Sequence, residues 1–256
     1  MTPLRMASLC LALLAANASG CTRNEGSPSD DAATDLARRV VHAAGGDRLG
    51  RVAQLSFRFV VESGGARAMA ADHRWDLRGE RDRVTWTDRA GHHYDVVVDL
   101  HARTAVGTLD GAPIPPDKLA ETSRVAYQRW VNDSYWLLMP AKLLDPGVER
   151  ALEEPRVHGG RRYDILRLSF QGVGLTPRDR YWLYVDPRSA RVERWEMILG
   201  GQSPPPKGFS WTAYRRVGPL TLAHDHASDD GTRHIRFEGT GALDRVDPAA
   251  FRVPGT

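Results

Sequence analysis

The chain has 256 residues and a formal charge of +3, with 35 Lys and Arg against 32 Asp and Glu. That length is sufficient for one large domain with its own hydrophobic core. Acidic and basic residues are interspersed, as in RGERDR at residues 78–83, so no basic block of the kind that binds nucleic acid is present. The two cysteines, Cys10 and Cys21, are too few for a thiolate zinc site.

The first residues have the pattern of a secretory signal. Arg5 precedes an apolar run at residues 6–16, which is too short to span a membrane. The run ends in Ala-Ser-Gly-Cys, which resembles the lipobox of bacterial lipoproteins, although Ala18 stands where Leu is usual. Cys10 would leave with the signal, so Cys21 is left without a disulfide partner in the chain. We therefore expect a signal peptide over 1–20, a lipidated Cys21 (for example with palmitate) opening a flexible tether over 21–33, and one domain over 34–256.

The lipobox resemblance also implies a location. Several acyl chains would hold the protein stably in a membrane. Thr22 follows the cysteine in place of the Asp that tends to hold enteric lipoproteins in the inner membrane, so we expect an outer-membrane anchor with the domain in the periplasm. Cleavage after Ala18 is the alternative, because Ala16-Asn17-Ala18 fits the A-x-A rule, and it would give a soluble periplasmic protein.

Along the domain, a helix is predicted over 34–46, with Thr34 or Asp35 as its cap and Gly45-Gly46 at its end. Apolar residues then alternate with polar ones, which predicts a run of strands. A second helix is predicted over 115–131, with Pro116 in its first turn. The predicted strands are 55–62, 73–79, 82–88, 92–100 and 103–111 before this helix, and 161–170, 178–187, 190–199, 208–216, 220–228 and 233–239 after it.

This order of elements predicts a mainly β (α+β) fold. Alternation on one face indicates a sheet with one buried side, and ten or more antiparallel strands must curl or close. We expect a single curled antiparallel sheet of about 10–11 strands that forms a half-open barrel. The N-terminal helix and the central helical insertion would cover its concave side.

The segment WVNDSYWLLMPAKLLDPG, residues 130–147, is too apolar for a surface connection. We expect Asn132 and Asp133 to end the helix, and the following residues to cross the open side of the sheet. Leu143 and Leu144 are predicted to plug the interior, while the residues from Tyr135 to Met139 line a cavity. The candidate ligand-binding residues are Trp130, Tyr135, Trp136, Leu138 and Met139 here, with Phe57 and Phe59 on a predicted strand.

Three motifs carry a family resemblance: AAGGDRLGRVAQLSF at 43–57, NDSYWLLMPAKLLDPGV at 132–148 and YWLYVDPRSARVERWEM at 181–197. Together they resemble the LolA/LolB-like superfamily of periplasmic lipoprotein carriers, and in particular an uncharacterised family of LolA-like outer-membrane lipoproteins. The resemblance covers residues 35–251. It implies a half-open barrel with helices over an apolar cavity for acyl chains, and it fixes no catalytic residue.

Enzymatic patterns are weak. His224 and His226 would point to one face of a strand, as metal ligands could, with Asp229, Asp230 or His234 as a third ligand. A polar outer face of the strand explains them better. The sequence has no nucleophile elbow, phosphate loop or nucleotide fingerprint, so we expect no enzyme and no cofactor.

The leading hypothesis is a monomeric, lipid-anchored protein that binds a lipid, an acyl chain or another apolar ligand. Its partners would be the membrane, through the anchor, and that ligand. The alternative is a non-catalytic interaction scaffold of the cell envelope with a filled barrel. A metal-dependent enzyme using His224 and His226 is the third possibility.

Overall fold

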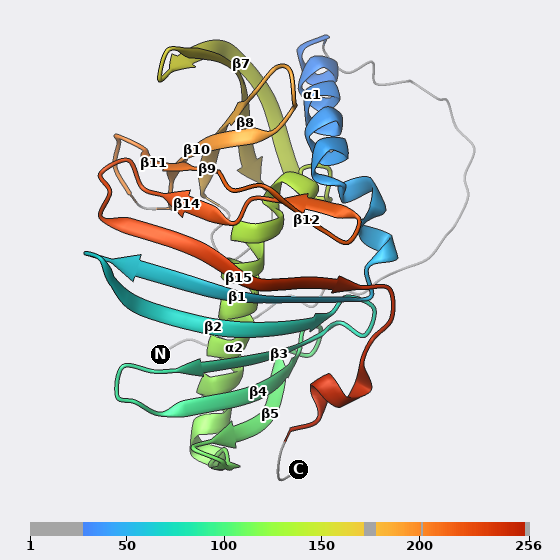
Figure 1. The fold of residues 1–256 in the computed structure, drawn as a ribbon, viewed down its shortest axis with the longest axis vertical. Helices are drawn as coiled ribbons and strands as arrows, with labels where there is room; N and C mark the ends of the chain where they lie inside the picture. The colour runs from blue at the N-terminus through green and yellow to red at the C-terminus, as the bar shows by residue number, and fades with distance from the viewer. Residues whose placement is uncertain (1–27, 172–177, 201, 254–256) are drawn as a thin grey trace, which may run out of the picture.

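The structure is a computed structural model of the chain that describes residues 28–171, 178–200 and 202–253 (Figure 1). The expected signal peptide and Cys21 lie outside the described residues. Within the described part, no helix has both the length and the apolar character that crossing a bilayer would require.

The first helix begins earlier than predicted. It starts at Pro28, inside the expected tether, where a proline suits the first turn because the N–H that it lacks would be unpaired there. It ends before Gly45, whose φ of 75° is a left-handed conformation that glycine adopts without strain. The helices are α1 (Pro28–Ala44), η1 (Gly46–Arg51), α2 (Pro116–Leu138), η2 (Met139–Ala141) and η3 (Pro248–Phe251).

Helix α2 is longer than predicted. It continues through Asn132 and Asp133 to Leu138, so the prediction that these two residues end the helix is wrong. Asp disfavours helix interiors when its side chain competes for nearby backbone groups. Here the Asp133 carboxylate is engaged by the side chains of Asn132 and His73 instead. The 3-10 helix η2, which contains Pro140, follows directly.

The first sheet has eight antiparallel strands in the order β14-β15-β1-β2-β3-β4-β5-β6. Irregularities in the pairing of β1 lie between Ser56 and Arg58 towards β15, and between Val61 and Glu62 towards β2. The strands are β1 (Gln54–Ser63), β2 (Ala66–Asp76), β3 (Arg81–Thr87), β4 (His93–Asp99), β5 (Thr104–Leu109), β6 (Ala112–Pro113), β14 (Asp225–Ala227) and β15 (Arg233–Leu243).

The second sheet has five antiparallel strands in the order β11-β10-β9-β8-β7, and β12 and β13 form a separate ribbon. Two isolated bridges, Phe209 to Ser228 and Thr212 to Asp225, connect the sheets. The strands are β7 (Val148–His158), β8 (Arg161–Phe170), β9 (Arg180–Val185), β10 (Val192–Ile198), β11 (Lys207–Ser210), β12 (Arg215–Val217) and β13 (Leu220–Leu222).

The mainly β, antiparallel architecture is confirmed, but the single sheet is not. The described residues form fifteen strands in three sheets, and the edge strands β6 and β7 are not paired with each other. The discrepancy arises at β11 to β14. The predicted strands 208–216 and 220–228 each divide there into two strands of three or four residues, too short for alternation to show their ends, and Gly218 at φ 56° turns the chain between β12 and β13.

Helix α2 joins the two sheets. It runs across one face of the first sheet and reaches the second with its C-terminal end (Figure 1). Ala126 on α2 packs with Val84 and Val96 in one apolar cluster on β3 and β4. Leu137 belongs to a larger cluster that also contains Leu166 of β8 and the inner side chains of α1. Both long helices therefore pack against the sheets.

Candidate functional site

Trp136, on the last turn of α2, contacts aromatic side chains from both sheets. Its ring centroid lies 4.4 Å from that of Trp195 on β10, 5.0 Å from Phe209 on β11 and 5.6 Å from His226 on β14. Trp211 extends the group, at 5.1 Å from Trp195 and 4.3 Å from His226. All five side chains are buried. We call them the Trp136 cluster; it fills the junction between the two sheets with apolar rings.

Tyr135 lies at the rim of this cluster and is only partly buried. Its ring centroid is 5.9 Å from Tyr181 on β9 and 6.2 Å from both Phe170 on β8 and Trp195. Burial raises the pKa of both tyrosine hydroxyls, and the Tyr181 hydroxyl donates to Asp179 over 3.1 Å. The rim therefore combines aromatic faces with neutral hydroxyl groups.

Four residues after Trp136 belong to the core, namely Leu137, Leu138, Met139 and Leu143. Leu138 and Met139 are fully buried, and Leu143 is 1% exposed. Leu144 is 41% exposed, so the prediction that it plugs the interior together with Leu143 is wrong. Only one of two neighbouring side chains faces inward after η2.

Phe57 and Phe59 occupy alternate positions of β1 and point to the same buried face. Phe237 on β15 packs edge-on to both, at 5.8 Å from Phe57 and 5.5 Å from Phe59. Phe237 also lies 5.8 Å from His226. The two phenylalanines are thus linked to His226 of the Trp136 cluster through one intervening ring, that of Phe237.

Trp130 makes its ring contacts elsewhere. It is partly buried, and it packs edge-on to Trp75 of β2 at 5.2 Å and beside Tyr127 at 5.6 Å. The structure therefore brings Tyr135 and Trp136 together at the second sheet, and leaves Trp130 on the part of α2 that covers the first sheet.

A buried polar network beside Phe57 was missed by the sequence analysis. His73 on β2 lies between two carboxylates, with Nδ1 2.7 Å from Asp82 of β3 and Nε2 3.1 Å from Asp133 of α2. These three side chains are at most 1% exposed. Burial alone would lower the pKa of His73, but the two carboxylates outweigh it and raise the pKa to about 9. His73 is therefore an imidazolium that donates from both ring nitrogens.

Arg129 adds a second cation close to this network. Burial lowers the pKa of its guanidinium, and the nearby Asp133 opposes that effect. The guanidinium donates to the sulfur of Met69 over 3.1 Å and lies over the ring of Trp86, 5.1 Å from its centroid. Burial raises the pKa of Asp82. Two cations and two acidic groups thus compensate one another where α2 meets the first sheet.

A sequence signal for this network exists in the apolar faces themselves. Asp82 shares the inward face of its strand with Val84 and Trp86. Asp133 follows Ala126 at a helical spacing of seven residues, on the stripe that faces the sheet. A charged residue on an apolar face is almost never buried without a partner. This rule would have identified both aspartates as members of a buried polar network.

The structure assigns other roles to His224 and His226. His224 bonds the Leu222 carbonyl at 2.9 Å and the Thr240 hydroxyl at 2.8 Å. Burial lowers the pKa of His226 to about 3 and keeps its imidazole neutral, against a smaller opposing effect from the backbone of Ser210. No group of three or more His, Cys, Asp or Glu in the described part of the chain could hold a metal ion.

The candidate third metal ligands have partners of their own. Asp229 pairs with Arg194, and His234 lies 2.7 Å from Asp225. Asp230 accepts hydrogen bonds from Ser228 and Thr232, which lower the pKa of its carboxyl to about 2. The expectation that the histidine pair lies on a polar outer face is wrong, because both histidines are buried.

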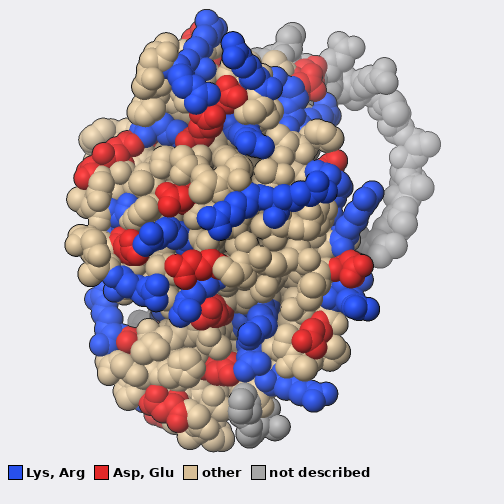
Figure 2. Space-filling view, in the orientation of Figure 1, with Lys and Arg blue, Asp and Glu red and all other residues tan. Residues whose placement is uncertain are grey.

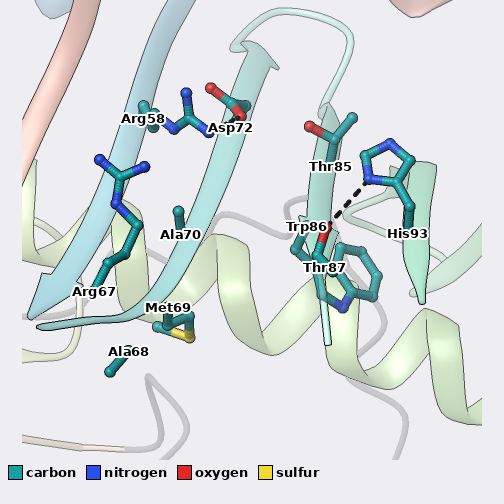
Figure 3. A pocket seen from close by; sticks show the side chains of 10 residues that line it. All are labelled: Arg58, Arg67, Ala68, Met69, Ala70, Asp72, Thr85, Trp86, Thr87 and His93. Carbon is teal, nitrogen blue, oxygen red and sulfur yellow. Dashed lines mark hydrogen bonds and ion pairs between the residues drawn. The ribbon is translucent and has the colours of Figure 1, made fainter. Parts of the chain in front are cut away.

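Two of the clefts on the surface carry charged side chains. Figure 3 shows one of about 290 Å³ on the first sheet, where Arg58 and Asp72 lie 3.6 Å apart and the Thr87 hydroxyl is 3.5 Å from His93. Another, of about 630 Å³, lies on the second sheet and is lined by charged groups that include Arg194. Neither of these two clefts is lined by the candidate ligand-binding residues.

A LolA superfamily protein from Nitrosomonas europaea has a similar structure, with a TM-score of 0.50 and 10% identity over 84% of this chain and 97% of that one. The fold is LolA-like. A DUF1329 family protein from Desulfovibrio piger has a TM-score of 0.48 and 12% identity, covering 88% of this chain and 98% of that one. Lipoprotein LppX from Mycobacterium tuberculosis has a TM-score of 0.33 and 11% identity, covering 86% and 100%.

No protein-family model matches the sequence, and no curated protein matches it. The LolA-like fold that the three sequence motifs indicate is confirmed by the structural likeness. At 10% identity, that likeness concerns the fold alone.

Proposed function

We propose that this protein binds an acyl chain or another apolar ligand between α2 and the two sheets, as a carrier-like lipoprotein of the cell envelope. The observation that carries the proposal is the Trp136 cluster, a buried apolar contact between a helix end and the junction of two sheets. The LolA-like fold supports it, because the sequence resemblance implies an acyl-chain ligand at the concave side of the sheet. In this proposal the two sheets act as a half-open barrel.

The contacts of α2 suggest where the ligand enters. The helix is held to the first sheet by the packing of Ala126 near its middle and by the charged contact of Asp133, five residues before its end, with His73. Beyond Asp133, the helix meets the second sheet through the rings of Tyr135 and Trp136, and the described residues form no ion pair between this end of the helix and that sheet. A small outward movement of this end would open a space lined by Tyr135, Trp136, Leu138 and Met139, with Phe57 and Phe59 deeper inside.

The energetic balance favours a long chain. Breaking one aromatic contact costs about 0.5–1.5 kcal/mol in addition to the cost of exposing its buried area. Trp136 makes three such contacts. Each buried CH₂ group contributes about 0.8 kcal/mol. A chain that buries ten or so CH₂ groups would gain about 8 kcal/mol and could replace these contacts, whereas a short one could not.

Native mass spectrometry of the full-length protein, purified in mild detergent from its own envelope, tests this function. A lipid adduct is the expected result. A brominated fatty acid should also quench the tryptophan emission of the purified protein, and Trp136→Phe should reduce that quenching. Trp182→Phe is the matched control, because Trp182 packs with Tyr163 and Tyr184 in a separate small cluster and donates to Glu153. Absence of both adduct and quenching would contradict the proposal.

The envelope location rests on Cys21, which we propose to be acylated after cleavage of residues 1–20 and to hold the domain on the periplasmic side of the outer membrane. The intact mass of the mature protein should then exceed that of its chain by several acyl groups. Cys21→Ala should remove the added mass and shift the protein from the membrane fraction to the soluble envelope fraction. A mature chain beginning at Ser19 would contradict the anchor.

A second candidate is an interaction scaffold with a permanently filled interior. The observation that favours it is the complete burial of Leu137, Leu138 and Met139 in the present conformation. A scaffold would yield a ligand-free native mass, no quenching by the brominated fatty acid and a retained protein partner on pull-down. Both proposals assign a non-catalytic role to a monomer without a cofactor. Elemental analysis of the purified protein tests the metal alternative at His224 and His226.

A further inference from the structure

A groove with arginine side chains at its rim lies between α1 and the turn that joins β9 to β10. Its volume is about 480 Å³. Apolar atoms of Ala43, Pro187 and Ala190 contribute to its lining. The charged and titratable side chains that line it are Arg38, Arg39 and His42 from α1 and Arg188 from the turn.

The arginines of this groove are available to an external anion. Arg38 pairs with Asp35 at 2.8 Å and Arg39 with Asp164 at 3.7 Å, but these arginine side chains remain 64% and 54% exposed. Exposed pairs of this kind contribute about 0–1 kcal/mol, so a phosphate can replace the aspartate. Arg188 is exposed and makes no ion pair within the described residues. Guanidinium groups bind phosphate through paired hydrogen bonds, which makes this rim suitable for an anionic headgroup.

A second basic element lies at the same end of the molecule. Asp164 on β8 is paired with Val185 on β9, which places the β7–β8 turn beside the β9–β10 turn. Near the tip of the β7–β8 hairpin, Val157 is 72% exposed and the neighbouring Arg162 is exposed. The N-terminal end of α1 and this hairpin lie at one end of the ribbon (Figure 1), and Figure 2 shows basic side chains gathered there with a few acidic ones among them.

The length of chain before α1 would keep this end close to a membrane that holds Cys21. Six residues, 22–27, lie between Cys21 and Pro28, so the chain from one to the other spans at most about 25 Å. An acylated Cys21 would therefore keep the N-terminal end of α1 within that distance of the lipid surface. The exposed stripe of α1 carries Arg38, Arg39 and His42 about two to four turns further along.

We propose that the arginine groove and the tip of the β7–β8 hairpin dock on an anionic lipid surface and orient the anchored domain. Arg38, Arg39 and Arg188 bind lipid phosphates, while Val157 enters the boundary between headgroups and acyl chains. The inference rests on the proposed lipid anchor for its geometry, and it does not depend on the ligand between α2 and the sheets.

Vesicle flotation with the full chain tests the docking surface. The Cys21→Ala background removes the acyl anchor, and the probes are vesicles of phosphatidylcholine alone and of an equal mixture with phosphatidylglycerol. We compare the ratio of binding to the mixed vesicles over binding to phosphatidylcholine alone. Apolar contributions from the N-terminal segment are the same for both kinds of vesicle and cancel in this ratio. Charge at such a surface changes affinity about five-fold per arginine. The triple change Arg38→Glu, Arg39→Glu and Arg188→Glu should therefore lower the ratio on the order of a hundred-fold or more.

The matched control is the triple change Arg74→Glu, Arg78→Glu and Arg89→Glu, which alters net charge equally at exposed positions on and beside the first sheet. It should leave the ratio nearly unchanged. Equal losses in the two triple variants, or no loss in the groove variant, would overturn the proposal. Substitution by Gln at the same positions repeats the test if a Glu variant does not fold. Quenching by the brominated fatty acid should persist in the groove variant, so failure of docking is distinguishable from failure of ligand binding.

Discussion

The carboxylate of Asp133 on α2 lies 3.1 Å from the imidazole of His73 on β2, and both side chains are buried. This contact connects the helix to the sheet by a hydrogen bond between opposite charges. Asp82 on the other side of His73 and Arg129 nearby keep the charges balanced. A buried ionic network need not stabilise a fold more than apolar packing would, but loss of one member leaves an uncompensated charge in the interior.

Asp133→Ala should therefore destabilise the protein strongly, because the imidazolium of His73 loses one of its two acceptors. We expect the free energy of unfolding to fall by about 3–5 kcal/mol. Asp117→Ala is the matched control on the same helix, since Asp117 is exposed in the first turn and contributes about 0.3–1 kcal/mol through the helix dipole. Urea unfolding of both variants measures the difference, and similar losses in the two would argue against the network.

The same network predicts a dependence on alkaline pH. The pKa of His73 is raised from 6.5 to about 9 in the folded protein. Below pH 6.5 both states hold the proton, and the stabilisation is complete. As the pH rises towards 9, the unfolded state has lost the proton that the folded state retains, so stability falls, by up to about 3 kcal/mol.

Urea unfolding between pH 6.5 and 9 should show this decrease in the natural protein and little of it in His73→Gln. His92→Gln, at an exposed side chain, is the control and should keep the decrease. A decrease of the same size in His73→Gln would mean that another group titrates in this range.

His226 predicts the opposite dependence, on the acid side. Burial lowers its pKa to about 3, so the folded imidazole stays neutral while the unfolded one takes up a proton below pH 6.5. Its contribution to stability is present above pH 6.5 and is lost as the pH falls towards 3. Between pH 6.5 and 5 this histidine should lower the free energy of unfolding with a slope of about 1.4 kcal/mol per pH unit, because one proton is taken up on unfolding.

His226→Phe should reduce this slope by that amount, because a ring of similar size keeps the contacts with Trp211 and Trp136 without a titrating group. His42→Phe, at a side chain that is 80% exposed, should leave the slope unchanged. Unfolding midpoints in urea at several pH values give both slopes. An unaltered slope in His226→Phe would show that the carboxylates alone account for the acid response.

The sequence was sufficient to predict the antiparallel β architecture and the two long helices, since these follow from apolar spacing. It did not predict where α2 ends. Asn132 and Asp133 are typical of helix ends, and only the tertiary contact of Asp133 with His73 explains why the helix continues. The same limit applies to the predicted strands 208–216 and 220–228, each of which divides into two, because β12, β13 and β14 have three residues each and alternation does not show where such short strands end.

The candidate site was predicted less completely than the fold. Composition pointed to Tyr135 and Trp136, but ring contacts between α2 and β10 depend on tertiary packing that no local spacing reveals. His73 was missed because a histidine on a strand is unremarkable until its two aspartates, 9 and 60 residues away in the chain, are brought beside it.

Leu143 and Leu144 allow the packing of the interior to be tested with two substitutions of the same kind. They are neighbours in sequence and equal in chemistry, but Leu143 is 1% exposed and Leu144 is 41% exposed. Leu143→Ala should leave a cavity in the core cluster that also contains Met139 and Leu166, and cost about 2–5 kcal/mol of unfolding free energy. Leu144→Ala removes a partly solvated side chain and should cost well under about 1.5 kcal/mol. Chemical denaturation measures both, and comparable losses would mean that this segment packs differently from the structure described.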